Sequence, residues 1–101
     1  MSITVNKNDE QNALVISVPG RFDFSKHNEF RKAYKDINIE NGIYEIDLRA
    51  TEYLDSSALG MMLLLKEIAD ENSSIVKITH ANNELREILR IASFDKLFVI
   101  E

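Results

Sequence analysis

Short β-rich runs alternate with helix-like patterns along this chain, and that alternation is the feature that most restricts its fold. Strands that alternate with helices require crossover connections, which favour a parallel or mixed sheet packed by helices. The first two β-rich runs are separated only by a short polar stretch, so they can pair antiparallel. We therefore predict an α/β fold in the order β-β-α-β-α-β-α-β, with a mixed four- to five-stranded sheet packed by about three helices.

The boundaries follow from Gly, Pro and Asn residues and from the spacing of apolar residues. Strands are expected at residues 3–5, 13–18, 43–48, 75–79 and 97–100, with a polar turn at 6–12. Ser25 is the expected N-cap of a first helix, which presents Phe30, Ala33, Tyr34 and Ile37 on one face. A long second helix runs to about residue 70. Asn82 or Asn83 caps a third helix, whose apolar face holds Leu85, Ile88, Leu89 and Ala92.

Composition limits the class of protein and the partners to expect. At 101 residues, 45% of them hydrophobic, the chain has the size of one domain, which we take to span residues 1–101. The absence of Cys excludes disulfides and thiolate chemistry, and it fits a cytoplasmic protein. A net charge of −5 disfavours nucleic acid and anionic lipid as partners. No leader sequence or membrane-spanning run is recognised, so we expect no insertion into a membrane.

The motif with the most chemical content is Asp55-Ser56-Ser57-Ala58-Leu59-Gly60, between a predicted strand and the long helix. The first N–H groups of a helix lack partners and carry partial positive charge. An anion attached to Ser56 is therefore expected to find hydrogen-bond donors nearby. Asp and Ser are also common N-cap residues, so the same motif is compatible with a purely structural cap.

Projection of the long helix at about 100° per residue separates two faces. The core face contains Ala58, Met61, Met62, Leu65, Ile68 and Ala69. The opposite face contains Lys66, Glu67, Asp70, Ser56, Leu59 and Leu63, with Gly60 at its edge. Leu59 and Leu63 are thus apolar residues on the polar side. They either pack under a neighbouring loop or form a small docking surface beside Ser56.

Three segments give the sequence a resemblance to the STAS domain, which anti-sigma factor antagonists share with the cytoplasmic parts of sulphate transporters. The first is Val18-Pro19-Gly20-Arg21-Phe22-Asp23, similar to a family strand that ends in a Gly-x-Leu-Asp turn. The second, and the most specific, runs from Asp47-Leu48 to Leu54-Asp55-Ser56-Ser57-Ala58-Leu59-Gly60. The third is the last helix with its ending Phe94-Asp95-Lys96-Leu97-Phe98. The likeness covers nearly the whole chain and implies a STAS-like architecture.

The resemblance implies a phosphorylation-controlled signalling switch rather than an enzyme, with no cofactor or metal. In such antagonists a kinase of the histidine-kinase-like ATPase type phosphorylates the Ser after the Asp, and a metal-dependent serine phosphatase reverses the reaction. The unmodified form binds an anti-sigma factor or comparable regulator, and the free domain is commonly a monomer. Carried over, Ser56 is the phosphoacceptor, surrounded by Asp23, Asp55, Ser57 and Gly60. The partner-binding residues are Leu59, Leu63, Phe22 and Asp23.

This chain departs from the common family pattern at two positions. Ala58 stands where Gly is frequent, and it favours the helix by about 1 kcal/mol. Phe22 replaces a usual Leu. Neither change removes the hydroxyl on which the proposed switch depends, and both leave open which class of partner this surface fits.

Two alternatives remain open from the sequence. The chain is also compatible with a constitutive interaction subunit of a membrane transport or signalling assembly, without phosphorylation. An enzyme is the other alternative, because Asp23, Asp47 and Asp55 can approach one another at strand ends. However, His27 and His80 have no metal-site or nucleophile spacing, and the isolated glycines form no phosphate loop.

Overall fold

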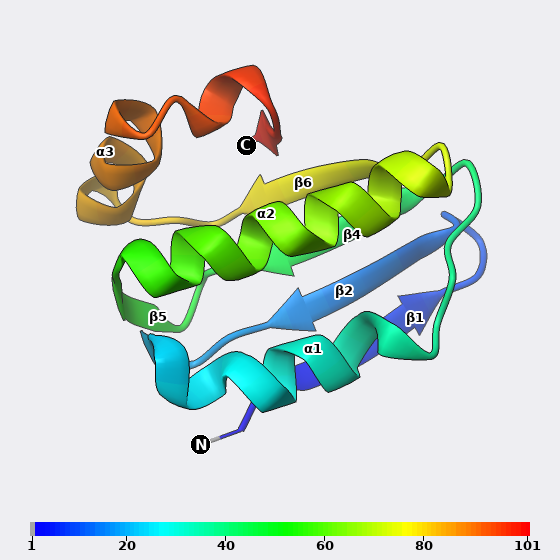
Figure 1. Cartoon of the computed structure of the whole chain (residues 1–101), viewed down its shortest axis with the longest axis horizontal. Helices are drawn as coiled ribbons and strands as arrows, with labels where there is room; N and C mark the ends of the chain where they lie inside the picture. Colours follow the sequence, from blue (N-terminus) through cyan, green and yellow to red (C-terminus); the bar gives the residue numbers. More distant parts are fainter. Residues whose placement is uncertain (1) are drawn as a thin grey trace.

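The computed structural model describes residues 2–101 and contains the mixed sheet and three α-helices that the sequence predicts (Figure 1). The strands are β1 (Thr4–Asn8), β2 (Ala13–Ser17), β3 (Gly20–Phe22), β4 (Ile43–Asp47), β5 (Thr51–Leu54), β6 (Ile75–Thr79) and β7 (Val99–Ile100). The α-helices are α1 (His27–Lys35), α2 (Ser56–Glu71) and α3 (Asn83–Ile91). Two 3-10 turns, η1 (Phe24–Lys26) and η2 (Phe94–Lys96), complete the chain.

The five-stranded sheet has the order β1-β2-β4-β6-β7, with β1 antiparallel to β2 and the other pairs parallel. From β2 onward, each new parallel strand is added on the same side. Right-handed crossovers in one direction place their helices on one face of the sheet. Accordingly, α1 and α2 lie side by side across one face, while α3 lies near the C-terminal strand (Figure 1).

Alternation along the central strands determines which sheet face is buried. Leu14, Ile16, Tyr44 and Ile46 point beneath the helices and are fully buried. The opposite face carries more polar and half-buried residues, among them the register-matched trio Val15, Glu45 and Lys77. One side of the sheet thus forms the core, as side-chain alternation requires.

Several predicted boundaries are wrong at the chain's N-terminal end. β1 continues to Asn8 through residues assigned to a polar turn, because its backbone pairs with β2 although all five of its residues are exposed. Ser25 does not cap α1; instead, Asp23 caps η1, and Ser25 donates to the Asp23 side chain. α1 then begins at His27 without a side-chain cap.

Two short strands lay outside the sequence prediction. β3 and β5 form a separate parallel pair, and Phe22 lies opposite Leu54. These strands have three and four residues, which is too short to show a clear alternation. The C-terminal strand is also shorter than predicted, since η2 precedes it. The pair β3–β5 matters because the candidate site begins where both strands end.

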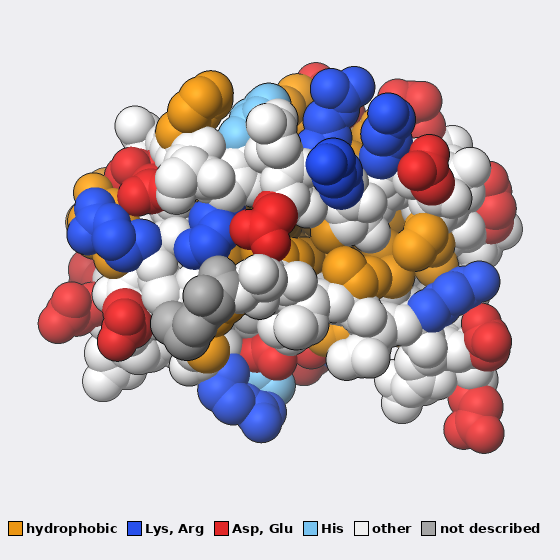
Figure 2. Space-filling model, turned by 90° about the horizontal axis from the view of Figure 1, so that it is seen from below, with side chains coloured by type: hydrophobic (Ala, Val, Ile, Leu, Met, Phe, Trp, Pro, Cys, Tyr) orange, Lys and Arg blue, Asp and Glu red, His pale blue; other side chains and the backbone are white. Residues whose placement is uncertain are grey.

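Surface charge is unevenly distributed despite the net charge of −5. Seen from below, Lys and Arg side chains gather over α1 at the top of Figure 2, with hydrophobic side chains close by. The α1 contributors are Arg31, Lys32 and Lys35, all exposed. A strongly acidic chain therefore presents one locally basic helix.

Candidate functional site

Two neighbouring turns of the same type form the candidate site. The buried residues Phe22 and Leu54 are paired in the parallel strands β3 and β5. The residues that follow them, Asp23 and Asp55, both have extended backbone and each starts a helical segment. Each Asp is followed two positions later by a Ser. The fold therefore places two Asp-x-Ser turns next to each other.

The Asp55 carboxylate is the N-cap of α2. Its Oδ1 atom accepts hydrogen bonds from the Ser57 amide at 3.0 Å, the Ser57 hydroxyl at 2.6 Å and the Ala58 amide at 3.2 Å. The Ser57 hydroxyl is the main cause that lowers the pKa of Asp55, and the two amides lower it further. Partial burial and the negative charge of Asp23 act in the opposite direction. Asp55 is thus held as a carboxylate that fixes the start of α2.

This cap changes one expectation about phosphate at Ser56. The Ser57 and Ala58 amides already donate to Asp55, and the Leu59 amide donates to the Asp55 carbonyl oxygen at 3.2 Å. The prediction that an anion on Ser56 finds free donors at the helix end is therefore wrong for these three amides. Because Ser56 itself is exposed, a phosphate attached there would extend into solvent.

Asp23 caps the neighbouring turn in the same way. Its Oδ1 atom accepts the amide of Ser25 at 3.0 Å and also its hydroxyl, and these bonds are the main causes that lower the pKa of Asp23. Arg21 adds an ion pair of 3.3 Å to Oδ2 and lies 4.0 Å from the centre of the Tyr53 ring. The Asp23 carboxylate is thus committed to local contacts, with its side chain still 23% exposed.

The predicted two faces of α2 agree with the burial of its residues. Ala58, Met61, Met62, Leu65 and Ala69 are buried, and Ile68 is half-buried. On the other face, Ser56 and Gly60 are exposed, Leu63 is 39% exposed and Leu59 is half-buried against the core. We call Ser56, Leu59, Gly60 and Leu63 the α2 patch. A Cβ atom added at Gly60 would meet nothing within 4 Å, so the patch is open there.

One predicted partner-binding residue lies in the wrong place. Phe22 is fully buried and packs on Phe30 at a ring-centroid distance of 5.1 Å, so it cannot contact a partner directly. Two residues further along, Phe24 is 69% exposed and stacks on His27 at 5.1 Å. In its own Asp-x-Ser turn, Phe24 occupies the same position as Ser56. The Asp-x-Ser spacing, which occurs at both Asp23 and Asp55, is the sequence signal that could have revealed this equivalence.

His27 contacts the first turn through Phe24, whereas His80 and the third aspartate, Asp47, do not join these turns. His80, in the loop after β6, contacts the Asp47 carboxylate at 3.0 Å and the Arg49 guanidinium at 2.9 Å. Asp47 also accepts the amide of Arg49 at 2.9 Å. Asp47 therefore belongs to a separate polar cluster, whereas Asp23 and Asp55 are close enough for their charges to interact.

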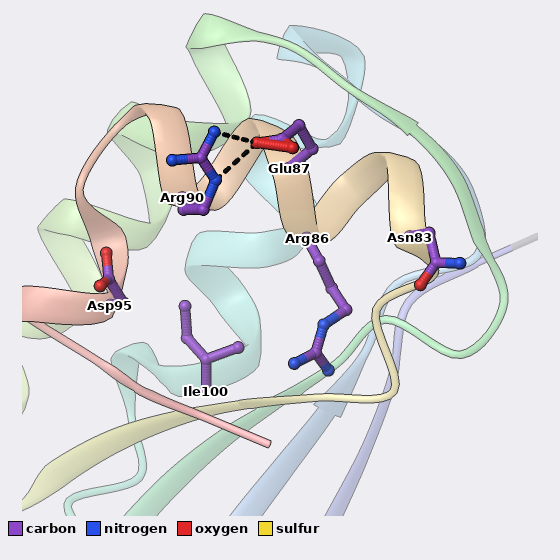
Figure 3. A pocket seen from close by; sticks show the side chains of 6 residues that line it. All are labelled: Asn83, Arg86, Glu87, Arg90, Asp95 and Ile100. Atoms are coloured by element: carbon purple, nitrogen blue, oxygen red, sulfur yellow. Dashed lines mark hydrogen bonds and ion pairs between the residues drawn. The ribbon is translucent and has the colours of Figure 1, made fainter.

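The structure also has a cavity of about 470 Å³ between α3 and the C-terminal strand. Arg86 reaches into it from α3 and Ile100 faces it from β7 (Figure 3). Arg90 is paired with Glu87 and is therefore neutralised at the rim (Figure 3). None of the site residues predicted from sequence lines this cavity. Within residues 2–101, no helix has the length and apolar character needed to cross a membrane.

Comparisons with known proteins agree with this architecture. The family model described as "Mlab, STAS domain" matches residues 5–101. A STAS-domain containing protein of Pseudomonas aeruginosa (strain UCBPP-PA14) is 42% identical over 100 residues, which cover 99% of each chain.

Solved structures of more distant sequence share the fold. An anti-sigma factor antagonist from Mycobacterium paratuberculosis is similar with a TM-score of 0.78 and 23% identity, covering 98% of this chain and 85% of that one. A sulfate transporter family protein from Wolinella succinogenes gives a TM-score of 0.75 and 14% identity, covering 88% and 76%. From the family model and the Pseudomonas relative, together with the site geometry, we conclude that this chain belongs to the STAS domain family.

Proposed function

We propose that this STAS protein is a phosphorylation-controlled interaction switch of the anti-sigma factor antagonist type, which acts by binding rather than by catalysis. Ser56 accepts a phosphoryl group from a partner kinase of the histidine-kinase-like ATPase type. A metal-dependent serine phosphatase removes it. The unmodified form, a monomer when free, binds an anti-sigma factor or comparable regulator. Anti-sigma factor antagonists among the structures of similar fold support this proposal.

The observation that carries the proposal is the exposed position of Ser56 at the first residue of α2, beside the partly exposed Leu63. A kinase can reach this hydroxyl without opening the fold. The neighbouring cap is formed by Asp55 and Ser57 and does not use the Ser56 side chain. Modification of Ser56 therefore leaves the contacts that start α2 in place.

Phosphorylation of Ser56 would mainly weaken the binding of a partner and would leave the STAS domain itself unchanged. A phosphate adds about −1.5 to −2 charge at neutral pH. It would stand beside Asp55, whose pKa is lowered, and near Asp23, so the local surface becomes strongly negative. A partner that covers the α2 patch would have to remove water from this dianion, which opposes binding. The switch thus needs no conformational change in the STAS domain.

The experiment compares wild-type, Ser56→Ala and Ser56→Asp proteins as baits for partners from source cells, and Ser57→Ala serves as the neighbouring control. We expect Ser56→Ala to retain the regulator and Ser56→Asp to lose it. Intact mass and Phos-tag electrophoresis of the native protein should show one phosphate that is absent from Ser56→Ala. Equal retention of all partners by both Ser56 variants, together with an unmodified native protein, would contradict the switch.

The second candidate function is a constitutive STAS subunit of a membrane transport or signalling assembly. The similar fold of a sulfate transporter family protein is the observation that favours it. In that case the α2 patch binds its partner permanently, and Ser56 carries no phosphate. The mass measurement above distinguishes the two functions, because only the switch requires a modified population.

A further inference from the structure

A groove of about 370 Å³ lies between α1 and α2, and none of its lining residues belongs to the α2 patch. Its α1 wall carries His27, Arg31 and Lys35, which are four residues apart and therefore share one helix face. Its α2 wall carries Leu64 and Ile68, again four residues apart. The groove thus joins a basic stripe to an apolar stripe. Neither stripe belongs to the predicted site.

The basic wall is available for a partner. Among the ion pairs found within residues 2–101, none involves Arg31 or Lys35, and both side chains are exposed. The Arg31 guanidinium lies near the phenol of Tyr34. There it opposes the larger effect of burial, which raises the Tyr34 pKa. One carboxylate, Glu67, lies on the opposite wall. The balance of charge at the groove remains positive in a chain of net charge −5.

The apolar wall leaves hydrophobic surface in contact with water. Leu64 is 49% exposed, more than Leu63 of the α2 patch. Ile68 is half-buried, and the mostly buried Tyr34 ring contributes to the lining. Phe24 lies beyond His27 and is 69% exposed, so the aromatic surface continues past the end of the groove. Exposed apolar residues in a concave setting mark a surface that another molecule covers.

We propose that this α1–α2 groove is a second docking site, and that it binds an acidic amphipathic helix of a partner protein. Apolar residues of that helix, spaced by three or four positions, would pack on Leu64 and Ile68. Its carboxylates would pair with Arg31 and Lys35. The stripe from His27 to Lys35 covers the nine residues of α1. Its length of about 12 Å matches two to three turns of a bound helix.

Charge and shape argue against the other occupants. A second copy of this chain would bring another net charge of −5 to the interface, which opposes association. A lipid surface is flat, whereas the apolar residues here lie inside a groove between two helices. The site is also separate from phosphorylation, since Leu64 lies eight residues, or about 12 Å along α2, beyond Ser56. The inference therefore does not depend on the proposed switch.

The test is a selection of random 16-residue peptides on the immobilised full-length protein, followed by affinity measurements on the enriched peptides. We expect the enriched peptides to be acidic and helical, with apolar residues three or four positions apart. Arg31→Glu and Leu64→Ala should each weaken binding by about tenfold or more, as hot-spot residues do. Higher salt should weaken it as well, because exposed charges are screened.

Lys32→Glu is the matched control, since Lys32 is an exposed neighbour on α1 that does not line the groove. It makes the same charge change as Arg31→Glu and should alter affinity by less than about twofold. Ser56→Asp should also leave peptide affinity unchanged, which separates this site from the α2 patch. Equal weakening by Lys32→Glu and Arg31→Glu would overturn the proposal, as would enrichment of neutral or basic peptides only.

Two further measurements exclude the competing occupants. Sedimentation velocity of the full-length protein should show no dimer that Arg31→Glu abolishes. Vesicles that contain anionic phosphatidylglycerol should not retain the protein through Arg31. Either of these interactions would replace the peptide helix as the occupant. Circular dichroism melting of each variant establishes that lost affinity does not result from unfolding.

Discussion

Phe22 lies opposite Leu54 in the parallel pair β3–β5, and this one register brings the two Asp-x-Ser turns together. Both side chains are buried, so the positions of the turns are fixed by the core. The residues at the middle of the turns, Phe24 and Ser56, are both exposed. An aromatic side chain and a serine hydroxyl thereby lie exposed at equivalent positions of the two turns. Variants at these positions distinguish residues that stabilise the fold from residues that bind a partner.

Phe22→Ala should mainly lower the stability of the fold, whereas Phe24→Ala should mainly lower partner binding. Phe22→Ala removes a fully buried ring and should lower the free energy of unfolding by about 3–5 kcal/mol. Phe24→Ala removes a ring that is 69% exposed and should change stability by less than about 0.5 kcal/mol, while it weakens partner binding. Urea unfolding measures the first quantity and partner capture the second. A large loss of stability in Phe24→Ala would contradict the conclusion that this exposed ring contributes little to the core.

Gly60→Ala should stabilise the protein by about 0.5–1 kcal/mol, because Gly costs helix stability and an added Cβ meets nothing within 4 Å. The same methyl group should weaken binding of a partner to the α2 patch. Gly42→Ala provides the contrast, since its Cβ would collide with the carbonyl oxygen of Asn12. Thermal and urea unfolding should therefore show Gly60→Ala to be more stable than wild type and Gly42→Ala to be less stable. A loss of stability in Gly60→Ala would show that the patch is not open.

Ser57→Ala should destabilise the protein by about 0.5–1.5 kcal/mol, because it removes the hydroxyl that donates to Asp55 at 2.6 Å. Ser56→Ala and Ser56→Asp should each remain within about 0.5 kcal/mol of wild type, since the Ser56 side chain is exposed. Urea midpoints of the three variants measure this difference. If Ser56→Asp unfolded the domain, the switch would have to act through the fold rather than through the partner.

The stability of the protein should depend on pH through the two capping carboxylates, Asp23 and Asp55. Asp23 and Asp55 both have pKa values lowered from 3.8, mainly by hydrogen bonds from Ser25 and Ser57 respectively. A carboxyl with a lower pKa in the folded state stabilises the fold above its ordinary pKa. That contribution is lost as pH falls through the folded-state value.

Unfolding measured between pH 6 and pH 2.5 should therefore show wild-type stability falling below about pH 4. The variant Asp23→Asn/Asp55→Asn should be less stable at pH 6 and should lose less on acidification. Parallel curves for the two proteins would mean that these carboxylates do not contribute through ionisation. Asp9→Asn is a suitable control, because its side chain is 87% exposed.

Local patterns in the sequence carried much of the fold. Alternation and apolar spacing predict strands β4 and β6 and the core face of α2. This works because the residues of a buried face recur with the period of the strand or helix. Asn82 was correctly among the predicted caps of α3, where it accepts the Leu85 amide. The Asp55-Ser56 motif was equally visible, since a cap depends on residues close in sequence.

Only the tertiary structure decided which of these residues are exposed at the surface. Nothing local distinguishes Phe22 from Phe24, yet the pairing of β3 with β5 buries the first and leaves the second exposed. Likewise, the α1–α2 groove requires two helices that are distant in sequence to lie side by side. The sequence by itself determined strands β2, β4 and β6, the three helices, the buried face of α2 and the Asp55 cap, since these arise from nearby residues. Exposure, the twin turns and the groove arise from long-range packing, which no single segment encodes.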